Sequence, residues 1–147
     1  MKKCEDVFES EKKFIQTVKL KRDADFIIVD LHGEITSEKM AMGYFFDGKV
    51  TLVVGTHTHI PTSDHRILEK GTAYQTDIGM CGDYNSVIGM NRDNSLKRFF
   101  KDPSATKHYP ALGEATISGL MVNADDETGL AKKVEPIIVC GALESSK

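Results

Sequence analysis

Two apolar segments joined by a helical segment constrain the fold of this chain more than any other feature. Residues Phe26–Leu31 and Val50–Val54 have the composition of buried strands, and Thr36–Phe46 between them has that of a helix. Thr36 or Ser37 is expected to cap the start of this helix. A strand, a helix and a strand with short connections form a βαβ unit, which implies parallel strands and a right-handed crossover. The expected class is therefore α/β.

The rest of the chain predicts further elements around this unit. The expected elements are a helix at Val7–Arg22 with lysines at its end, strands at Arg66–Leu68 and Thr72–Thr76, a short helix at Asn94–Phe100 capped by Asp93, and a hairpin of Ala115–Asn123 with Ala131–Val139. No linker or internal repeat divides the sequence. We therefore expect residues 1–147 to form a single domain, with parallel strands early and an antiparallel hairpin at the C-terminal end.

Histidines follow both predicted strands of the βαβ unit. His32 stands at the end of the first strand, and Gly55-Thr56-His57-Thr58-His59 follows the second. Side chains two residues apart on extended backbone point to the same side, and parallel strands end along one sheet edge. His32, His57 and His59 are therefore expected to converge as metal ligands, since neutral imidazole suits Zn, Fe, Mn or Ni. For the H-x-H pair alone, the alternative is two surface histidines in a turn.

Four polar residues near these histidines have two interpretations each. Asp30 and Glu34 flank His32, where they either orient an imidazole N–H from outside the ligand set or solvate a strand end. Thr58 either donates to phosphate oxygens or favours extended backbone. Asp77 follows the predicted third strand, where it either reaches the same edge or forms a turn with the glycine nearby.

Composition limits the classes of partner. Hydrophobic residues make up 40% of the 147 residues and charged residues 28%, which is ordinary for a soluble globular domain. The net charge of −3 gives no basic footprint for bulk nucleic acid or for an anionic membrane, and the apolar runs are too short to span a bilayer. A small phosphorylated ligand is compatible with this charge, because a metal supplies positive charge locally.

The cysteines favour a reducing compartment. Cys4, Cys81 and Cys140 are odd in number and scattered, with no C-x-x-C pair and no disulfide framework. We therefore expect a cytoplasmic protein. A thiol or redox role for Cys81 would lack a nearby partner cysteine.

The motifs together resemble a known family. D-x-H-x-E at residues 30–34 followed by T-S-E-K, then G-T-H-T-H at residues 55–59 and the later S-V-I-G-M segment, resemble the C-terminal half of bacterial 2′,3′-cyclic-nucleotide 2′-phosphodiesterases. These belong to the calcineurin-like metallophosphoesterase superfamily. The resemblance extends over nearly the whole chain. It implies a partial metallophosphoesterase β-sandwich flanked by helices, with residues 1–147 corresponding to the C-terminal half of such a domain.

The resemblance also implies a binuclear centre of Fe, Mn or Zn, in which His32 and His57 bind one ion and His59 the other. The family's remaining ligands belong to an N-terminal half, in a first D-x-x-G strand, a G-E-N motif and a G-N-H motif. This chain has no G-E-N and no G-N-H. Two close divalent ions need a bridging anion to offset their repulsion, and two-metal hydrolysis needs both ions. We therefore expect this chain to hold one ion or none.

Two functions follow from this resemblance. The first is metal-dependent hydrolysis of a small phosphodiester or cyclic nucleotide, with the missing ligands supplied by a separate N-terminal-half chain or within a homo-oligomer. The second is a truncated or remnant fragment that is catalytically inactive, binds at most one metal and acts as an oligomer or interaction module. In either case, the isolated chain is expected to show little or no turnover.

Overall fold

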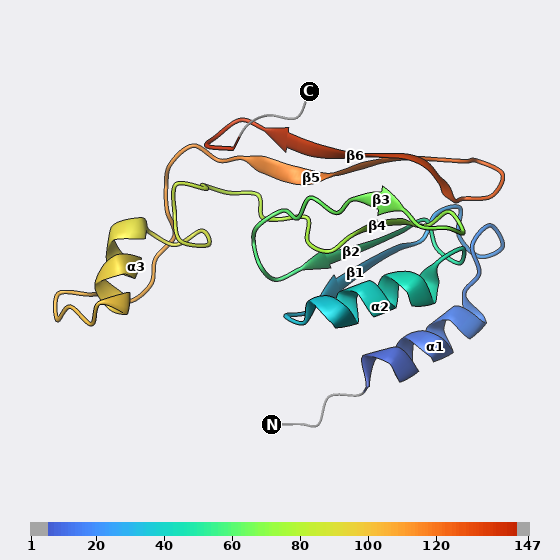
Figure 1. Cartoon of the computed structure of the whole chain (residues 1–147), viewed down its shortest axis with the longest axis horizontal. Helices are drawn as coiled ribbons and strands as arrows, with labels where there is room; N and C mark the ends of the chain where they lie inside the picture. Colours follow the sequence, from blue (N-terminus) through green and yellow to red (C-terminus); the bar gives the residue numbers. More distant parts are fainter. Residues whose placement is uncertain (1–5, 144–147) are drawn as a thin grey trace.

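The computed structural model describes residues 6–143 of the chain (Figure 1). Its helices and strands are α1 (Val7–Thr17), β1 (Ile28–His32), α2 (Thr36–Phe46), β2 (Leu52–Thr56), β3 (Arg66–Ile67), β4 (Ala73–Gln75), α3 (Arg92–Phe99), β5 (Ile117–Ala124) and β6 (Ala131–Val139). The order along the chain is the predicted one.

The strands form a mixed four-stranded sheet and a separate hairpin. The sheet has the order β1-β2-β4-β3, in which β1, β2 and β4 are parallel and β3 runs antiparallel to β4. Strands β5 and β6 form the antiparallel hairpin. The prediction of an α/β chain with parallel strands early and an antiparallel hairpin at its C-terminal end is therefore confirmed.

Helices and hairpin cover opposite faces of the sheet. Figure 1 shows α1 and α2 on one side and β5–β6 on the other. The helix side is filled by one apolar cluster that includes Met42, Phe46, Val53 and Tyr74. On the hairpin side, Leu52, Val54, Ala73 and Ala131 form a second cluster. Strand β2 is buried because it contributes to both clusters, which explains its continuous apolar sequence.

The start of α2 differs from the prediction that Thr36 or Ser37 caps it. The cap position is Ile35, which makes no side-chain capping hydrogen bond. Instead, the backbone N–H groups of Glu38 and Lys39 donate to the carbonyl of Ile35, at 3.1 and 3.2 Å. The helix begins directly where the short connection from β1 ends, and backbone bonds alone close its first turn.

Helix α2 spans the predicted residues, whereas the other two helices begin or end at different residues from those predicted. Helix α1 ends at Thr17 rather than Arg22, because Val18 is already extended and Lys21 and Arg22 lie in a turn. Helix α3 begins at Arg92, and its cap is Asn91, whose side chain accepts from the N–H of Asn94 at 3.0 Å. Asp93 is therefore in the first turn of α3 and is not its cap.

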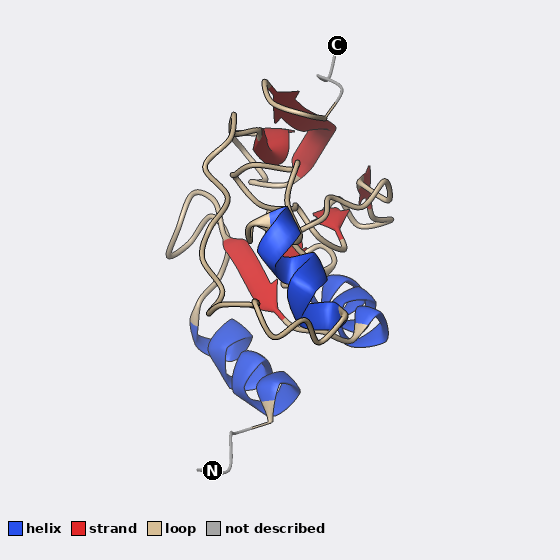
Figure 2. Cartoon of the chain, turned by 90° about the vertical axis from the view of Figure 1, so that its left-hand side faces the viewer, coloured by secondary structure: helices blue, strands red, loops and turns tan. Residues whose placement is uncertain are grey.

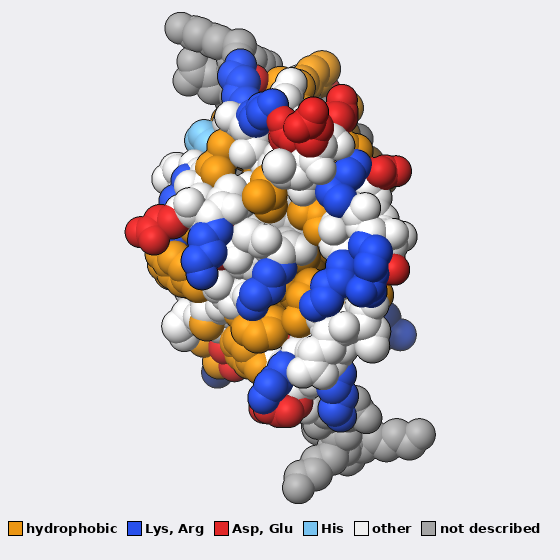
Figure 3. All heavy atoms as spheres, turned by 90° about the vertical axis from the view of Figure 1, so that its right-hand side faces the viewer, with side chains coloured by type: hydrophobic (Ala, Val, Ile, Leu, Met, Phe, Trp, Pro, Cys, Tyr) orange, Lys and Arg blue, Asp and Glu red, His pale blue; other side chains and the backbone are white. Residues whose placement is uncertain are grey.

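The two ends of the molecule differ in surface character. Helix α3 lies at the end of the molecule toward which β1 and β2 run (Figures 1 and 2). At the opposite end, Lys and Arg side chains are spread among hydrophobic ones and form no continuous basic surface (Figure 3). Within residues 6–143, none of the helices combines the length and apolar composition needed to cross a bilayer.

The packing of α2 on the sheet gives a prediction about stability. A Cβ at Gly43 would lie 2.5 Å from Cδ2 and 2.7 Å from Cε2 of Tyr74. The Tyr74 ring has no room to move, because it is 1% exposed and its hydroxyl is hydrogen bonded to Thr76. We expect Gly43→Ala to lower the free energy of unfolding by about 1–3 kcal/mol in urea denaturation, although alanine is the better helix former.

Gly119→Ala is the matched control, because no atom lies within 4 Å of a Cβ at that position. Its free energy of unfolding should stay close to that of the unaltered chain. Equal stability of the two variants would contradict close packing of α2 on the Tyr74 ring.

Candidate metal centre

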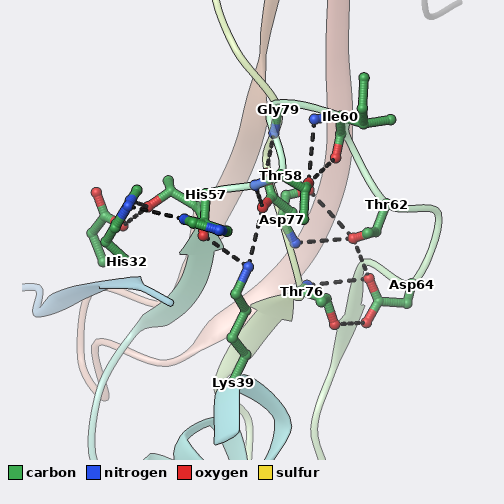
Figure 4. A network of polar contacts seen from close by, with 12 residues as sticks. His32, Lys39, His57, Thr58, Ile60, Thr62, Asp64, Thr76, Asp77 and Gly79 are labelled. Atoms are coloured by element: carbon green, nitrogen blue, oxygen red, sulfur yellow. Dashed lines mark hydrogen bonds and ion pairs between the residues drawn. The ribbon is translucent and has the colours of Figure 1, made fainter. Parts of the chain in front are cut away.

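Two of the three predicted histidine ligands meet at the carboxyl ends of β1 and β2. His32 pairs in register with Thr56, so both strands end at the same level, and His57 is the next residue after β2. Nδ1 of His57 lies 3.2 Å from Nε2 of His32 (Figure 4). The ring centroids are 5.0 Å apart and the rings are nearly perpendicular, at 75°. The convergence of these two side chains is therefore a property of the parallel strand pair.

A short hydrogen-bond chain orients His32. The hydroxyl of Thr56 donates to Oδ1 of Asp30 at 3.0 Å, so its oxygen is free to accept from Nδ1–H of His32 at 3.2 Å. In the neutral imidazole of His32, this arrangement places the single ring proton on Nδ1 and the lone pair on Nε2, which faces His57. Asp30 thus acts on His32 through Thr56.

His59 lies apart from this pair. Its Nδ1–H donates to the carbonyl of Ile88 at 2.8 Å, which leaves Nε2 with the lone pair. The ring makes no hydrogen bond to His32 or His57 among the described contacts. A contact to Ile88, and not to the other two histidines, therefore sets the orientation of the His59 ring.

The turn that carries the two later histidines is strained. The φ angles of His57 and His59 are +120° and +67°, a region that residues with a Cβ seldom adopt. Such conformations persist only where the surroundings impose them, and they concentrate at functional sites. The backbone at these two histidines therefore departs from the extended conformation on which the H-x-H prediction rested.

A buried carboxylate holds this turn. Asp77 is 0% exposed, and its Oδ2 accepts from the N–H of Thr58 at 2.9 Å and from Nζ of Lys39 at 3.1 Å. Its Oδ1 accepts from the N–H of Gly79 at 2.9 Å. Burial opposes ionisation of this carboxyl, but these hydrogen bonds outweigh it and lower the pKa of Asp77 below its usual range. The carboxylate of Asp77 therefore contacts the histidine turn through a backbone N–H of the turn, that of Thr58.

The remaining predicted residues have smaller roles in the geometry. Glu34 is exposed, and its carboxylate has no hydrogen-bond partner among residues 6–143. The hydroxyl of Thr58 donates to the carbonyl of Ile60 at 3.1 Å, which occupies it within the turn. Cys81 and Cys140 are free and exposed, whereas Cys4 lies outside the described residues.

Lys39 is the site residue that sequence reasoning missed. The buried residues of α2 are Lys39, Met42, Gly43 and Phe46, which is the spacing of one helix face. Nζ of Lys39 also donates to the carbonyl of Thr56 at 2.8 Å. A lysine in phase with the apolar residues of the predicted helix was the signal that could have revealed it.

A protein-family model matches almost the whole chain. Residues 1–137 correspond to the model described as YmdB-like protein. The chain belongs to the YmdB-like family. Since its relatives include phosphodiesterases and phosphatases, membership is consistent with phosphoester hydrolysis.

Individual relatives agree with this assignment. The YmdB-like chain is 47% identical over 114 residues to the 2′,3′-cyclic-nucleotide 2′-phosphodiesterase of Bacillus subtilis (strain 168), which covers 78% of this chain and 43% of that protein. A crystal structure of a novel phosphatase from Mycoplasma pneumoniae has a TM-score of 0.80 and 41% identity, covering 93% of this chain and 47% of the other.

The crystal structure of a hypothetical protein from Thermus thermophilus gives the same TM-score of 0.80 at 35% identity, covering 95% of this chain and 52% of the other. The YmdB-like chain therefore spans about half the length of the relatives it matches.

The facing nitrogens of the YmdB-like chain fit two ligands of a single ion. Nitrogens bound at about 2.0–2.1 Å to a tetrahedral ion lie about 3.3–3.4 Å apart, close to the 3.2 Å between His57 and His32. Metal-binding imidazoles usually donate their other N–H to an oxygen acceptor, as His32 and His59 do here. The histidines therefore fit part of a shell for Zn, Fe or Mn, for which His57 must release its Nδ1 proton.

A complete shell is not assembled by the described part of the chain. Among residues 6–143, no group of three or more His, Cys, Asp or Glu side chains is arranged to hold an ion. A hard ion would need carboxylate oxygen in addition to the two imidazoles.

The orientation of His32 gives a prediction for its tautomer. Thr56→Val keeps the branched shape of the side chain but removes the hydroxyl between His32 and Asp30. Losing one hydrogen bond, worth about 1 kcal/mol, should lower the ratio of Nδ1–H to Nε2–H tautomer at His32 by about fivefold. ¹⁵N–¹H correlation spectra of the imidazole rings at mildly alkaline pH measure this ratio. The exposed His108 serves as the internal reference, and an unchanged His32 ratio would contradict the proposed orientation.

A second carboxylate, at Asp64, fixes the loop that follows the histidine turn. Its oxygens accept from the hydroxyls of Thr62 and Thr76, both at 2.6 Å, and from the N–H of Thr76 at 3.1 Å. Arg66 forms an ion pair with it at 3.3 Å. Burial opposes ionisation, but these contacts prevail and lower the pKa of Asp64 below its ordinary value.

This pKa makes the contribution of Asp64 to stability depend on pH. A carboxyl with a lowered folded-state pKa stabilises the fold above its unfolded pKa, and this stabilisation is lost as pH falls through the folded value. We expect Asp64→Asn to lower the free energy of unfolding by about 1–3 kcal/mol at neutral pH. Urea titrations should show the difference closing as pH falls below about 4. A difference that stayed constant throughout the acid range would refute the ionised role.

Proposed function

We propose that this chain provides part of the active site of a metal-dependent phosphodiesterase that hydrolyses a small phosphodiester or cyclic nucleotide. The observation that carries the proposal is the 3.2 Å approach of the His57 and His32 nitrogens in a chain whose relatives hydrolyse phosphoesters. In this proposal His32 and His57 hold one divalent ion, and His59 is a ligand directed at a second position. The ion is Fe, Mn or Zn.

The chain's own residues would prepare this site in three ways. Thr56 and Asp30 keep the lone pair of His32 on Nε2, and the carbonyl of Ile88 does the same for Nε2 of His59. Asp77 holds the turn between them. A divalent ion, when bound, would polarise a phosphoryl oxygen and lower the pKa of an adjacent water, so that the water could attack phosphorus as hydroxide.

We further propose that the chain corresponds to the C-terminal half of a metallophosphoesterase domain. The supporting observations are its coverage of 42% to 52% of its relatives and the lack, among the described residues, of a carboxylate that completes a shell with the two imidazoles. The other ligands would then come from a polypeptide equivalent to the remaining half, or from another copy of the chain.

A second candidate function follows from the incomplete shell. With no cluster of three or more ligating side chains among residues 6–143, a chain acting alone would be an inactive fragment that binds at most one ion. Its role would then be interaction with a partner or with itself.

Hydrolysis of 2′,3′-cyclic AMP in the presence of Mn²⁺ tests the proposal, together with metal content after dialysis. We expect the isolated chain to bind no more than one ion, to turn over little or no substrate, and to lose the ion in His57→Ala. His108→Ala removes an exposed histidine outside the site and should leave metal content unchanged.

The outcomes separate the two functions. If the unaltered chain binds no ion, His32 and His57 do not hold one without ligands from another polypeptide. Turnover within tenfold of a full-length relative, abolished in His57→Ala, would show that a working site assembles without ligands from another polypeptide. Metal binding without turnover fits a chain that holds one part of a divided site.

A further inference from the structure

Lys39 and Asp77 form the one ion pair, among the described residues, in which both side chains are buried. Their side chains are 2% and 0% exposed. Taking two charges out of water costs several kcal/mol per ion, and the pair recovers this only through good geometry and additional hydrogen bonds. The pair is therefore weak evidence of stability by itself, and the partners of its additional hydrogen bonds indicate what it does.

These additional hydrogen bonds reach the backbone on both sides of His57. Nζ of Lys39 donates to the carbonyl of Thr56 at 2.8 Å, and Oδ2 of Asp77 accepts from the N–H of Thr58 at 2.9 Å (Figure 4). The carbonyl precedes His57 and the N–H follows it. Both peptide units that set the direction of this ring are therefore bound to one buried ion pair.

The conformation of His57 requires such support. A residue with a Cβ at positive φ costs about 1–3 kcal/mol and persists only where its surroundings over-determine it. His57 has φ +120°. Hydrogen bonds that involve a charged group are about twice as strong as neutral ones. The ion pair supplies two of them to the strained turn.

We propose that Lys39 and Asp77 are positioning residues that hold His57 with Nδ1 facing Nε2 of His32. The inference rests on the metal site proposed above and identifies the residues that pre-form it. Both side chains are buried, and their described hydrogen bonds go to each other and to backbone groups, not to the imidazoles of His32 or His57. They act on the site only through the backbone of Thr56 and Thr58.

The glycine before the histidine motif belongs to the same arrangement. A Cβ at Gly55 would lie 2.6 Å from Cδ of Lys39 and 1.9 Å from the carbonyl oxygen of Thr76. Because Gly55 has no Cβ, there is room for the Lys39 side chain to extend from α2 to the end of β2. A lysine in α2, a glycine in β2 and an aspartate after β4 together form the support.

Hydrogen exchange on the metal-free protein tests the support directly. Because the N–H of Thr58 is bonded to buried Asp77, we expect it to be protected in the unaltered chain. Lys39→Met removes the ammonium and Asp77→Asn removes the charge while keeping the shape. Both should raise the Thr58 exchange rate by tenfold or more and weaken the nuclear Overhauser contact between the His32 and His57 rings. Lys49→Met, at an exposed lysine just after α2, is the matched control and should change neither.

Zinc affinity, measured by titration calorimetry, is the second readout. Loss of groups that orient metal ligands from outside the ligand set typically costs about 10–100-fold in affinity, and we expect that loss in Lys39→Met and Asp77→Asn. Lys49→Met should bind zinc as the unaltered chain does.

The two readouts separate failure of this inference from failure of the metal site. If the unaltered chain binds no zinc, it forms no metal site by itself. The Thr58 exchange rate and the contact between the His32 and His57 rings then still decide whether the ion pair positions His57. Variants that lose only free energy of unfolding, while keeping Thr58 protection and zinc affinity, would overturn the inference. If Lys39→Met does not fold, Asp77→Asn decides. A rapidly exchanging Thr58 N–H in the unaltered chain would overturn it without any variant.

Discussion

The parallel pairing of β1 with β2 is the interaction on which the rest of this structure depends. It aligns His32 with Thr56, so that the next residue, His57, emerges at the same edge. It also buries β2 between the two apolar clusters. The backbone ladder therefore fixes both the core and the position of the histidines.

Polar groups at that edge are organised by burial. Asp77 and Lys39 lie beneath the turn, where a charge is tolerated only when fully bonded, and their bonds go to backbone groups of the turn. Asp30 and Thr56 lie nearer the surface and orient His32 through one hydroxyl. The buried ion pair thus binds the backbone on both sides of His57, and the hydrogen-bond chain of Asp30 and Thr56 orients His32. These contacts explain how the turn keeps its shape although it contains histidines at positive φ.

The chain belongs to the YmdB-like family and matches about half of the length of each relative. The arrangement of His32 and His57 is interpreted with these two facts in view. Two imidazoles at ligand spacing, with no third ligating side chain among the described residues, are what one side of a divided metal site would contribute. In the proposed function, the residues of this chain orient two of the ligands, and hydrolysis depends on groups that complete the shell.

The sequence by itself determined the βαβ unit, the C-terminal hairpin and the convergence of His32 with His57. Each follows from apolar periodicity and from the rule that parallel strands end along one edge. It also determined the bounds of α2, but not its cap, nor the end of α1 and the start of α3, because Ile35 and Asn91 cap α2 and α3 through local backbone and side-chain bonds that compete closely with neighbouring choices. Only the tertiary structure decided that His59 turns to Ile88 and that Lys39 is buried against Asp77. Both depend on residues far apart in the chain, and a buried charge is stable only where the fold brings its partners to it.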